Sequence, residues 1–218
     1  MSSGGVTRFE RPELRGFLHE PAAARGLGMV LTHGAGSTCD APLLVAVAQA
    51  FCAAGVMVLR CDLPFRQRRA SGPPSPSSAA ADRAGLRSAA AALREIARGA
   101  VILAGHSYGG RQASILAADE PAIAAALLLL SYPLHPPAKP LQLRTQHFPN
   151  LRVPTTFVHG TADPFGSLAE LEAAIAAIPA PTDIIPIEKA GHDLKRGRFD
   201  LAALAQRFSS SFAKGPAA

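Results

Sequence analysis

Short runs of apolar residues recur along the chain and predict strands that are buried on both faces. The run LGMVLT at residues 27–32 is almost continuously apolar, whereas a strand with one face in water alternates apolar and polar residues. Such runs are typical of a mostly parallel sheet. The predicted strands lie at residues 27–32, 56–61, 100–104, 124–130, 155–159 and 184–187, with an earlier one at 15–19.

Alanine-rich stretches separate these runs and predict helices, because alanine has the highest helix propensity. Strands that alternate with helices are joined by right-handed crossovers, which place the helices over the sheet. The sequence therefore predicts an α/β fold with a mostly parallel twisted sheet of about seven strands and helices on both faces. The predicted helices lie at residues 42–54, 82–98, 111–118, 167–178 and 201–212.

The pattern contains no internal repeat and no composition shift, so residues 1–218 are expected to form a single domain. Its ends, about 1–8 and 213–218, are expected to be flexible. Residues 71–78 (SGPPSPSS) predict a mobile surface loop. Residues 133–150 contain five prolines and predict an irregular excursion between two strands.

Composition narrows the classes of function. Hydrophobic residues make up 48% of the chain and charged residues 17%, which is typical of a folded globular protein. The net charge of +6 raises the question of nucleic-acid binding. The arginines are scattered, however, and the densest group (Arg66, Arg68 and Arg69) has no interleaved aromatic residues. We expect a solvated basic loop there and no nucleic-acid partner.

Cysteine usage and hydropathy suggest a compartment. The three cysteines are odd in number and lack CxxC spacing, so neither a disulfide framework nor a zinc site is predicted. Residues 1–10 lack the apolar stretch of a secretion signal, and the apolar run at 122–130 is too short to span a bilayer. We expect a cytoplasmic protein with no membrane partner, metal or cofactor.

The candidate chemistry begins with GHSYG at residues 105–109, which matches the G-x-S-x-G motif. The motif follows a predicted strand and precedes a predicted helix, which is the context it requires. In such a turn the serine is held in a strained conformation with its hydroxyl exposed. Larger residues in place of the two glycines would collide with the neighbouring strand and helix. Ser107 is therefore the predicted nucleophile.

A serine hydroxyl needs a base to activate it, and the base needs an acid to orient it. His192 follows the predicted strand 184–187 and is the predicted base, although it also fits a surface loop. Asp163 follows the strand 155–159 and is the predicted acid; it also fits an Asp-Pro turn or a helix cap. Asp193 is an alternative acid, but adjacent residues seldom present their side chains to each other.

The tetrapeptide HGAG at residues 33–36 follows the strand 27–32 and predicts an oxyanion hole. Small residues let the backbone approach the reacting centre and direct an N–H group at a developing oxyanion. The expected donors are the backbone N–H groups of Ala35 and Tyr108, and His33 is expected to steady the loop. Alone, the tetrapeptide fits an ordinary turn equally well. Together with Ser107, Asp163 and His192, in that order at strand ends, it predicts the α/β-hydrolase fold.

Five segments carry a further resemblance: LTHGAG (31–36), GHSYGGR (105–111), SYPLHPP (131–137), LRT (143–145) and HGTADPF (159–165). They resemble the α/β-hydrolase-like proteins of the KANL/Tex group, which includes testis-expressed protein thirty and the hydrolase-like domain of a chromatin-complex subunit. The similarity runs from about Leu31 to His192. It implies the α/β-hydrolase fold, places nucleophile, acid and base on Ser107, Asp163 and His192, and supplies no substrate.

The leading hypothesis is a serine hydrolase that cleaves a carboxylic ester or thioester through an acyl-enzyme. Another reaction of the same three residues, such as amide cleavage or a lyase reaction, is one alternative. A non-catalytic interaction module that retains the fold is the other. The turn at the G-x-S-x-G motif is called the nucleophile elbow. Ser107 at this elbow excludes the dienelactone hydrolases that use cysteine and the dehalogenases that use aspartate.

The segment 133–150 predicts a minimal cap over the site. Its polar residues interrupt the apolar face that an amphipathic lid would need. We therefore expect an open, shallow site that prefers short acyl groups. The alternative is a compact cap in which Leu141, Leu143 and Phe148 form the floor of an acyl pocket.

Overall fold

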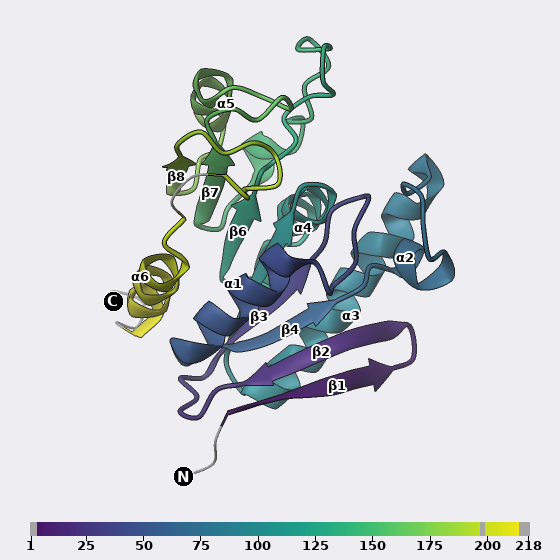
Figure 1. Cartoon of the computed structure of the whole chain (residues 1–218), viewed down its shortest axis with the longest axis vertical. Helices are drawn as coiled ribbons and strands as arrows, with labels where there is room; N and C mark the ends of the chain where they lie inside the picture. Colours follow the sequence, from purple (N-terminus) through teal and green to yellow (C-terminus); the bar gives the residue numbers. More distant parts are fainter. Residues whose placement is uncertain (1–3, 197–198, 214–218) are drawn as a thin grey trace.

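The chain forms one eight-stranded sheet in the computed structural model, which describes residues 4–196 and 199–213. The strand order is β1-β2-β4-β3-β5-β6-β7-β8, with antiparallel pairing at β1–β2 and β2–β4 and parallel pairing elsewhere (Figure 1). The strands are β1 (Gly5–Arg11), β2 (Leu14–Glu20), β3 (Leu27–Thr32), β4 (Met57–Cys61), β5 (Ala100–His106), β6 (Ala126–Leu130), β7 (Thr155–Gly160) and β8 (Thr182–Ile187).

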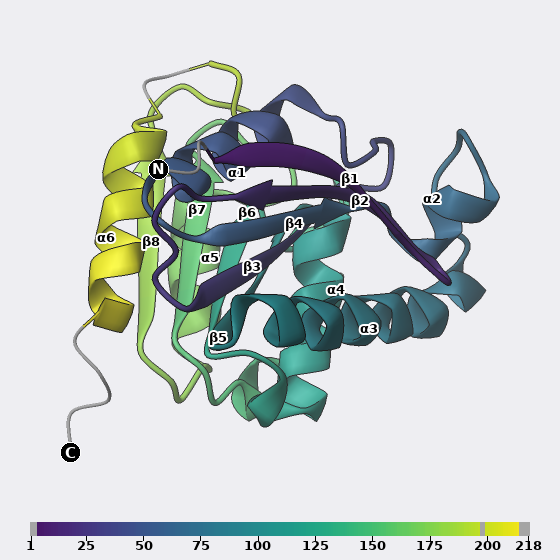
Figure 2. The ribbon, with the colours of Figure 1, turned by 90° about the horizontal axis from the view of Figure 1, so that it is seen from below.

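Helices cover both faces of this sheet, which confirms the predicted α/β architecture (Figure 2). Successive residues of a central strand point to opposite faces: Val30 packs in the α3 and α4 layer and Leu31 in the α1 and α6 layer. Both faces are therefore core, as the continuous apolar runs predict. The helices are α1 (Pro42–Ala53), α2 (Pro64–Arg68), α3 (Ala79–Ala97), α4 (Tyr108–Asp119), α5 (Leu168–Ile175) and α6 (Leu201–Ala213), with 3₁₀ turns at Pro76–Ser78, Pro121–Ile123 and Phe148–Asn150.

The amino-terminal end differs from the expectation. Residues up to about 8 are expected to be flexible, yet the chain forms β1 from Gly5 onward. Six of the seven β1 residues are exposed, so no apolar pattern marks the strand in the sequence. Backbone pairing with β2, from Gly5 opposite Glu20 to Arg11 opposite Leu14, holds it instead. Residues 1–3 and 214–218 of the expected flexible ends lie outside the described residues.

The topology brings the candidate site together. Strands β3, β5, β7 and β8 are parallel, so their carboxyl ends reach the same edge of the sheet. The loops that leave this edge carry HGAG (33–36), Ser107, Asp163 and His192.

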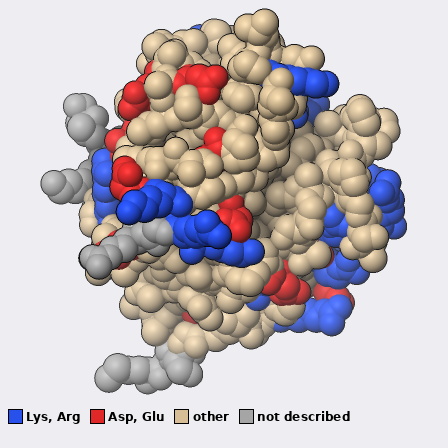
Figure 3. Space-filling model, turned by 45° about the horizontal axis from the view of Figure 1, so that its top comes forward, with Lys and Arg blue, Asp and Glu red and all other residues tan. Residues whose placement is uncertain are grey.

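Charged side chains are spread over the face of the molecule that Figure 3 shows. Figure 3 shows Lys and Arg side chains in several separate groups, most of them with Asp or Glu side chains nearby.

Among the helices that the structure describes, none combines the length and the apolar character needed to cross a bilayer.

Candidate active site

Ser107 lies in a sharp turn between β5 and α4 and has φ 51° and ψ −114°. A non-glycine residue at positive φ is strained, and this strain presents the hydroxyl at the top of the sheet. Gly105 and Gly109 are required because the backbone packing leaves no room for a side chain at either position. A Cβ atom on Gly105 would lie 2.5 Å from the backbone N of Gly110, and one on Gly109 would lie 2.6 Å from the carbonyl O of His33. The predicted strand–turn–helix context is therefore present.

The structure brings Ser107, His192 and Asp163 into one hydrogen-bonded chain. The Oγ atom of Ser107 lies 2.8 Å from Nε2 of His192, and Nδ1 of His192 lies 2.8 Å from Oδ2 and 3.0 Å from Oδ1 of Asp163. Because an ionised carboxylate only accepts, Nδ1 carries a proton and Nε2 is left to accept from the serine. The Asp163 side chain is fully buried, whereas that of His192 is 21% exposed.

Asp163 also organises its own loop. Its Oδ1 accepts a hydrogen bond from the backbone N–H of Phe165 at 2.9 Å, so the turn that was considered as an alternative role is present as well. The alternative acid, Asp193, is mostly exposed and forms an ion pair with Lys195 (3.3 Å). The structure therefore places Asp163, and not Asp193, against the imidazole of His192.

Two aromatic side chains that sequence reasoning did not single out position His192. The ring of Phe165 stacks on the imidazole with centroids 4.1 Å apart. His106, the residue before the nucleophile, donates from Nε2 to the backbone carbonyl of His192 (2.8 Å). Burial lowers the pKa of His106, so its neutral form is favoured. The elbow and the loop that carries His192 are thus joined directly.

The HGAG loop is held in place by the buried side chain of His33. Nδ1 of His33 donates to the carbonyl O of Gly34 (2.8 Å), and Nε2 accepts from the N–H of Leu63 (3.1 Å). This fixes the peptide between Gly34 and Ala35, because the N–H of a trans peptide points away from its C=O. A Cβ on Gly34 would lie 3.5 Å from Cβ of Ser107, which places the loop against the nucleophile. Burial lowers the pKa of His33 and favours this neutral form.

Tyr108 is the first residue of α4, where backbone N–H groups have no partner within the helix. Its hydroxyl donates to Oδ2 of Asp82 (2.7 Å), and Oδ1 of the same buried carboxylate accepts from the N–H of Phe65 (2.9 Å). Burial and this carboxylate raise the pKa of Tyr108. Asp82 thereby fixes the start of α4 relative to α2 and α3.

Arg66 is not part of a solvated loop, and that expectation is wrong for this residue. Its side chain is buried, and its guanidinium donates to the carbonyls of Ala35 (2.8 Å), Ser37 (2.8 Å) and Gly72 (3.0 Å). A guanidinium has five donors, so a single side chain can satisfy several carbonyls. Arg66 therefore joins the HGAG loop to the loop at residues 71–78, here called the proline-rich loop. Arg68 and Arg69 are exposed, as expected.

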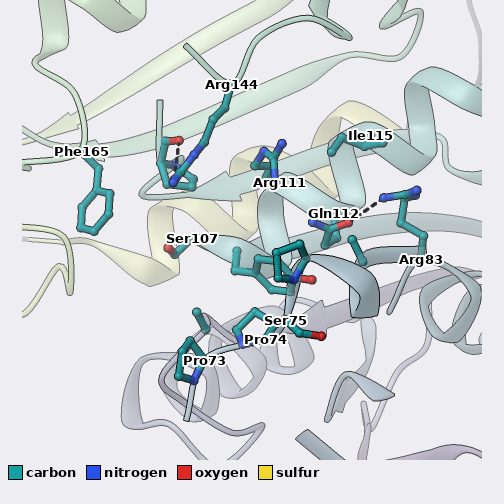
Figure 4. A pocket seen from close by; sticks show the side chains of 15 residues that line it. Pro73, Pro74, Ser75, Arg83, Ser107, Arg111, Gln112, Ile115, Arg144 and Phe165 are labelled. Atoms are coloured by element: carbon teal, nitrogen blue, oxygen red, sulfur yellow. Dashed lines mark hydrogen bonds between the residues drawn. The ribbon is translucent and has the colours of Figure 1, made fainter. Parts of the chain in front are cut away.

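A pocket of about 580 Å³ opens beside Ser107 (Figure 4). Pro73, Pro74 and Ser75 of the expected surface loop form one wall, and Phe165 lies on another side. Pro76 and Pro133 also line the pocket. The excursion 133–150 is irregular, as predicted. The compact cap considered as the alternative is wrong: Phe148 is buried in the core, Leu141 is 96% exposed, and neither they nor Leu143 line this pocket.

Comparison with known proteins decides the family. Residues 26–213 match the family model of an alpha/beta hydrolase domain. The chain belongs to the α/β-hydrolase family. Within the described part of this α/β-hydrolase, no three His, Cys, Asp or Glu side chains gather into a group that could hold a metal ion.

Several solved structures share the fold. A dienelactone hydrolase from Anabaena variabilis has a TM-score of 0.73 at 24% identity, with 97% of each chain covered. Est1E from Butyrivibrio proteoclasticus has a TM-score of 0.72 at 16% identity, covering 96% of this chain and 98% of its own. An α/β serine hydrolase without a lid from Xanthomonas campestris has a TM-score of 0.70 at 15% identity, covering 100% and 98%. At such identities the likeness establishes the fold alone.

Proposed function

We propose that this α/β-hydrolase is a serine hydrolase that cleaves a carboxylic ester or thioester through an acyl-enzyme. The observation that carries the proposal is the chain of hydrogen bonds from Oγ of Ser107 through His192 to Asp163. A scaffold would have no need of a strained serine with φ 51° in contact with an oriented imidazole.

Each residue has a defined role in the proposed reaction. His192 takes the hydroxyl proton at Nε2 as Ser107 Oγ attacks the carbonyl carbon, and Asp163 stabilises the imidazolium that forms. The N–H groups of Ala35 and Tyr108 donate to the oxyanion. The imidazolium then protonates the leaving group, and water, activated by the same base, releases the acid from Ser107.

We also propose that the chain belongs to the KANL/Tex group and that it prefers short acyl groups. Membership of the KANL/Tex group is supported by the SYPLHPP segment at 131–137, where Tyr132 is buried and donates to the carbonyl of Arg144 (2.6 Å). The preference for short acyl groups is supported by the open pocket and by the irregular, helix-poor excursion beside it.

A fluorophosphonate probe tests the proposal, because it reacts with an activated serine. We expect one adduct on Ser107 and hydrolysis of 4-nitrophenyl esters, both lost in Ser107→Ala by several orders of magnitude. Ser88→Ala, on an exposed position of α3, is the matched control and should label normally. A protein that folds but does not label, or labels only on another serine, would contradict the proposal and favour the interaction module.

A further inference from the structure

The pocket beside Ser107 is lined by three arginines from separate parts of the chain: Arg83 of α3, Arg111 of α4 and Arg144 of the excursion. Arg111 and Arg144 line the same pocket as Ser107 (Figure 4). Within residues 4–196 and 199–213, no carboxylate lies at ion-pair distance from any of the three.

The positive charges in this pocket oppose one another. Burial and the charge of Arg111 both lower the pKa of Arg144. Like charges that are partly removed from water without a counter-ion are costly, and an anion placed between them would relieve that cost. The electrostatics of the pocket therefore favour the binding of an anion.

Hydrogen bonding in the pocket is also incomplete. Gln112 is fully buried; its Oε1 accepts from Arg83 (3.0 Å), while its Nε2 has no partner within the described structure. Nε of Arg111 is buried and unpartnered in the same way. Native proteins satisfy nearly all buried donors, so donors that gather at one pocket indicate an acceptor that belongs there. This observation is independent of the charge argument and points to the same ligand.

We infer that the substrate of this enzyme carries an anionic group, a carboxylate or a phosphate, which Arg111 and Arg144 bind beside the ester carbonyl. The inference rests on the proposed function. Arg111 lies one helical turn after the nucleophile, with its N–H bonded to the carbonyl of Ser107 (2.9 Å). Residues spaced in this way lie about 5–6 Å apart at Cβ. The anionic group should therefore be only a few bonds from the carbonyl carbon.

A pair of esters with equal chain length tests the inference. The monoester of 4-nitrophenol with glutaric acid carries a terminal carboxylate, and 4-nitrophenyl pentanoate carries a methyl group in its place. We expect kcat/KM to favour the carboxylate ester by at least about tenfold, because charge-assisted bidentate pairs are the strong ones. A third ester, the 4-nitrophenyl ester of 4-phosphonobutanoic acid, carries a phosphonate in place of the carboxylate. A higher kcat/KM for this ester than for the carboxylate ester indicates a phosphate site, and a lower one indicates a carboxylate site.

Substitutions then assign the preference to residues. Arg111→Met and Arg144→Met keep most of the side-chain volume and remove the charge, and each should reduce the ratio of the two kcat/KM values toward one. Arg152→Met is the matched control, because Arg152 is exposed, bonds to the carbonyl of Pro149 and does not line the pocket. It should leave the ratio unchanged.

The outcomes separate the two proposals. Equal cleavage of the esters, or a preference that survives both pocket substitutions, overturns the anionic substrate and leaves the serine hydrolase standing. Failure to cleave any of the esters, together with no labelling of Ser107 by fluorophosphonate, overturns both. A tenfold preference that disappears in Arg111→Met and Arg144→Met, but not in Arg152→Met, supports both.

Discussion

Asp163 combines two tasks in a single buried carboxylate, since it accepts from the N–H of Phe165 and from the imidazole of His192. Replacing it with asparagine separates them. The amide oxygen can still accept from Phe165, but an amide NH₂ facing Nδ1 favours the wrong tautomer of His192. We expect Asp163→Asn to retain its melting temperature within a few degrees and to lose kcat by about 10⁴-fold.

Asp193→Asn is the control for this change, because it removes the same charge one residue from His192. Asp193 is mostly exposed and bonds to Lys195, so its substitution should leave kcat within about twofold. Steady-state kinetics of both variants, with circular dichroism to check folding, decide the acid. Near-normal activity of Asp163→Asn together with loss of activity in Asp193→Asn would show that the acid is Asp193 and not Asp163.

At the scale of elements, Arg66 couples three segments: α2, the HGAG loop and the proline-rich loop at 71–78. Arg66→Met would leave the carbonyls of Ala35, Ser37 and Gly72 without this donor. We expect a loss of about 1–3 kcal/mol in the free energy of unfolding. We also expect fluorophosphonate to react with Ser107 at least tenfold more slowly, because Ala35 is no longer held.

Arg68→Met, on the exposed side of the same short helix, is the control. Lysine cannot replace the planar fork of a guanidinium, so Arg66→Lys should also react slowly. Limited proteolysis gives a second readout, since the loop at 71–78 should be cleaved faster in Arg66→Met than in either the parent or the control. Unchanged labelling and cleavage would show that Arg66 only fills space.

Features of the fold that depend on neighbouring residues could be predicted from the sequence, whereas features that depend on contacts between distant elements could not. The central strands and the turn at Ser107 follow from local patterns, because burial on both faces and the need for Gly105 and Gly109 are written within a few residues. The role of Arg66 could not be predicted from a local pattern, because its partner Ala35 lies 31 positions away and offers only a backbone carbonyl. Likewise β1 is held by backbone pairing and carries no apolar pattern.

At the scale of the whole molecule, buried neutral histidines make stability depend on pH. Burial and Arg60 lower the pKa of His19 to about 4, and burial and Arg111 lower that of His147 to about 4. Burial also lowers the pKa values of His33 and His106. The unfolded chain has ordinary histidines with pKa about 6.5, so below that pH it binds protons that the folded protein does not.

The free energy of unfolding should therefore fall as the pH is lowered from about 6.5 towards 4, with each such histidine contributing up to about 1.4 kcal/mol per pH unit. Urea unfolding at pH 7.5, 6.5, 5.5 and 5.0 measures this before most carboxylates titrate. His19→Gln tests one contribution, because the glutamine oxygen can still accept from Nε of Arg60, which lies 2.8 Å from the imidazole in the parent. The variant should show a shallower decline than the parent between pH 6.5 and 5.0, whatever its stability at pH 7.5. Stability that does not change across this range would mean that these histidines are protonated equally in both states.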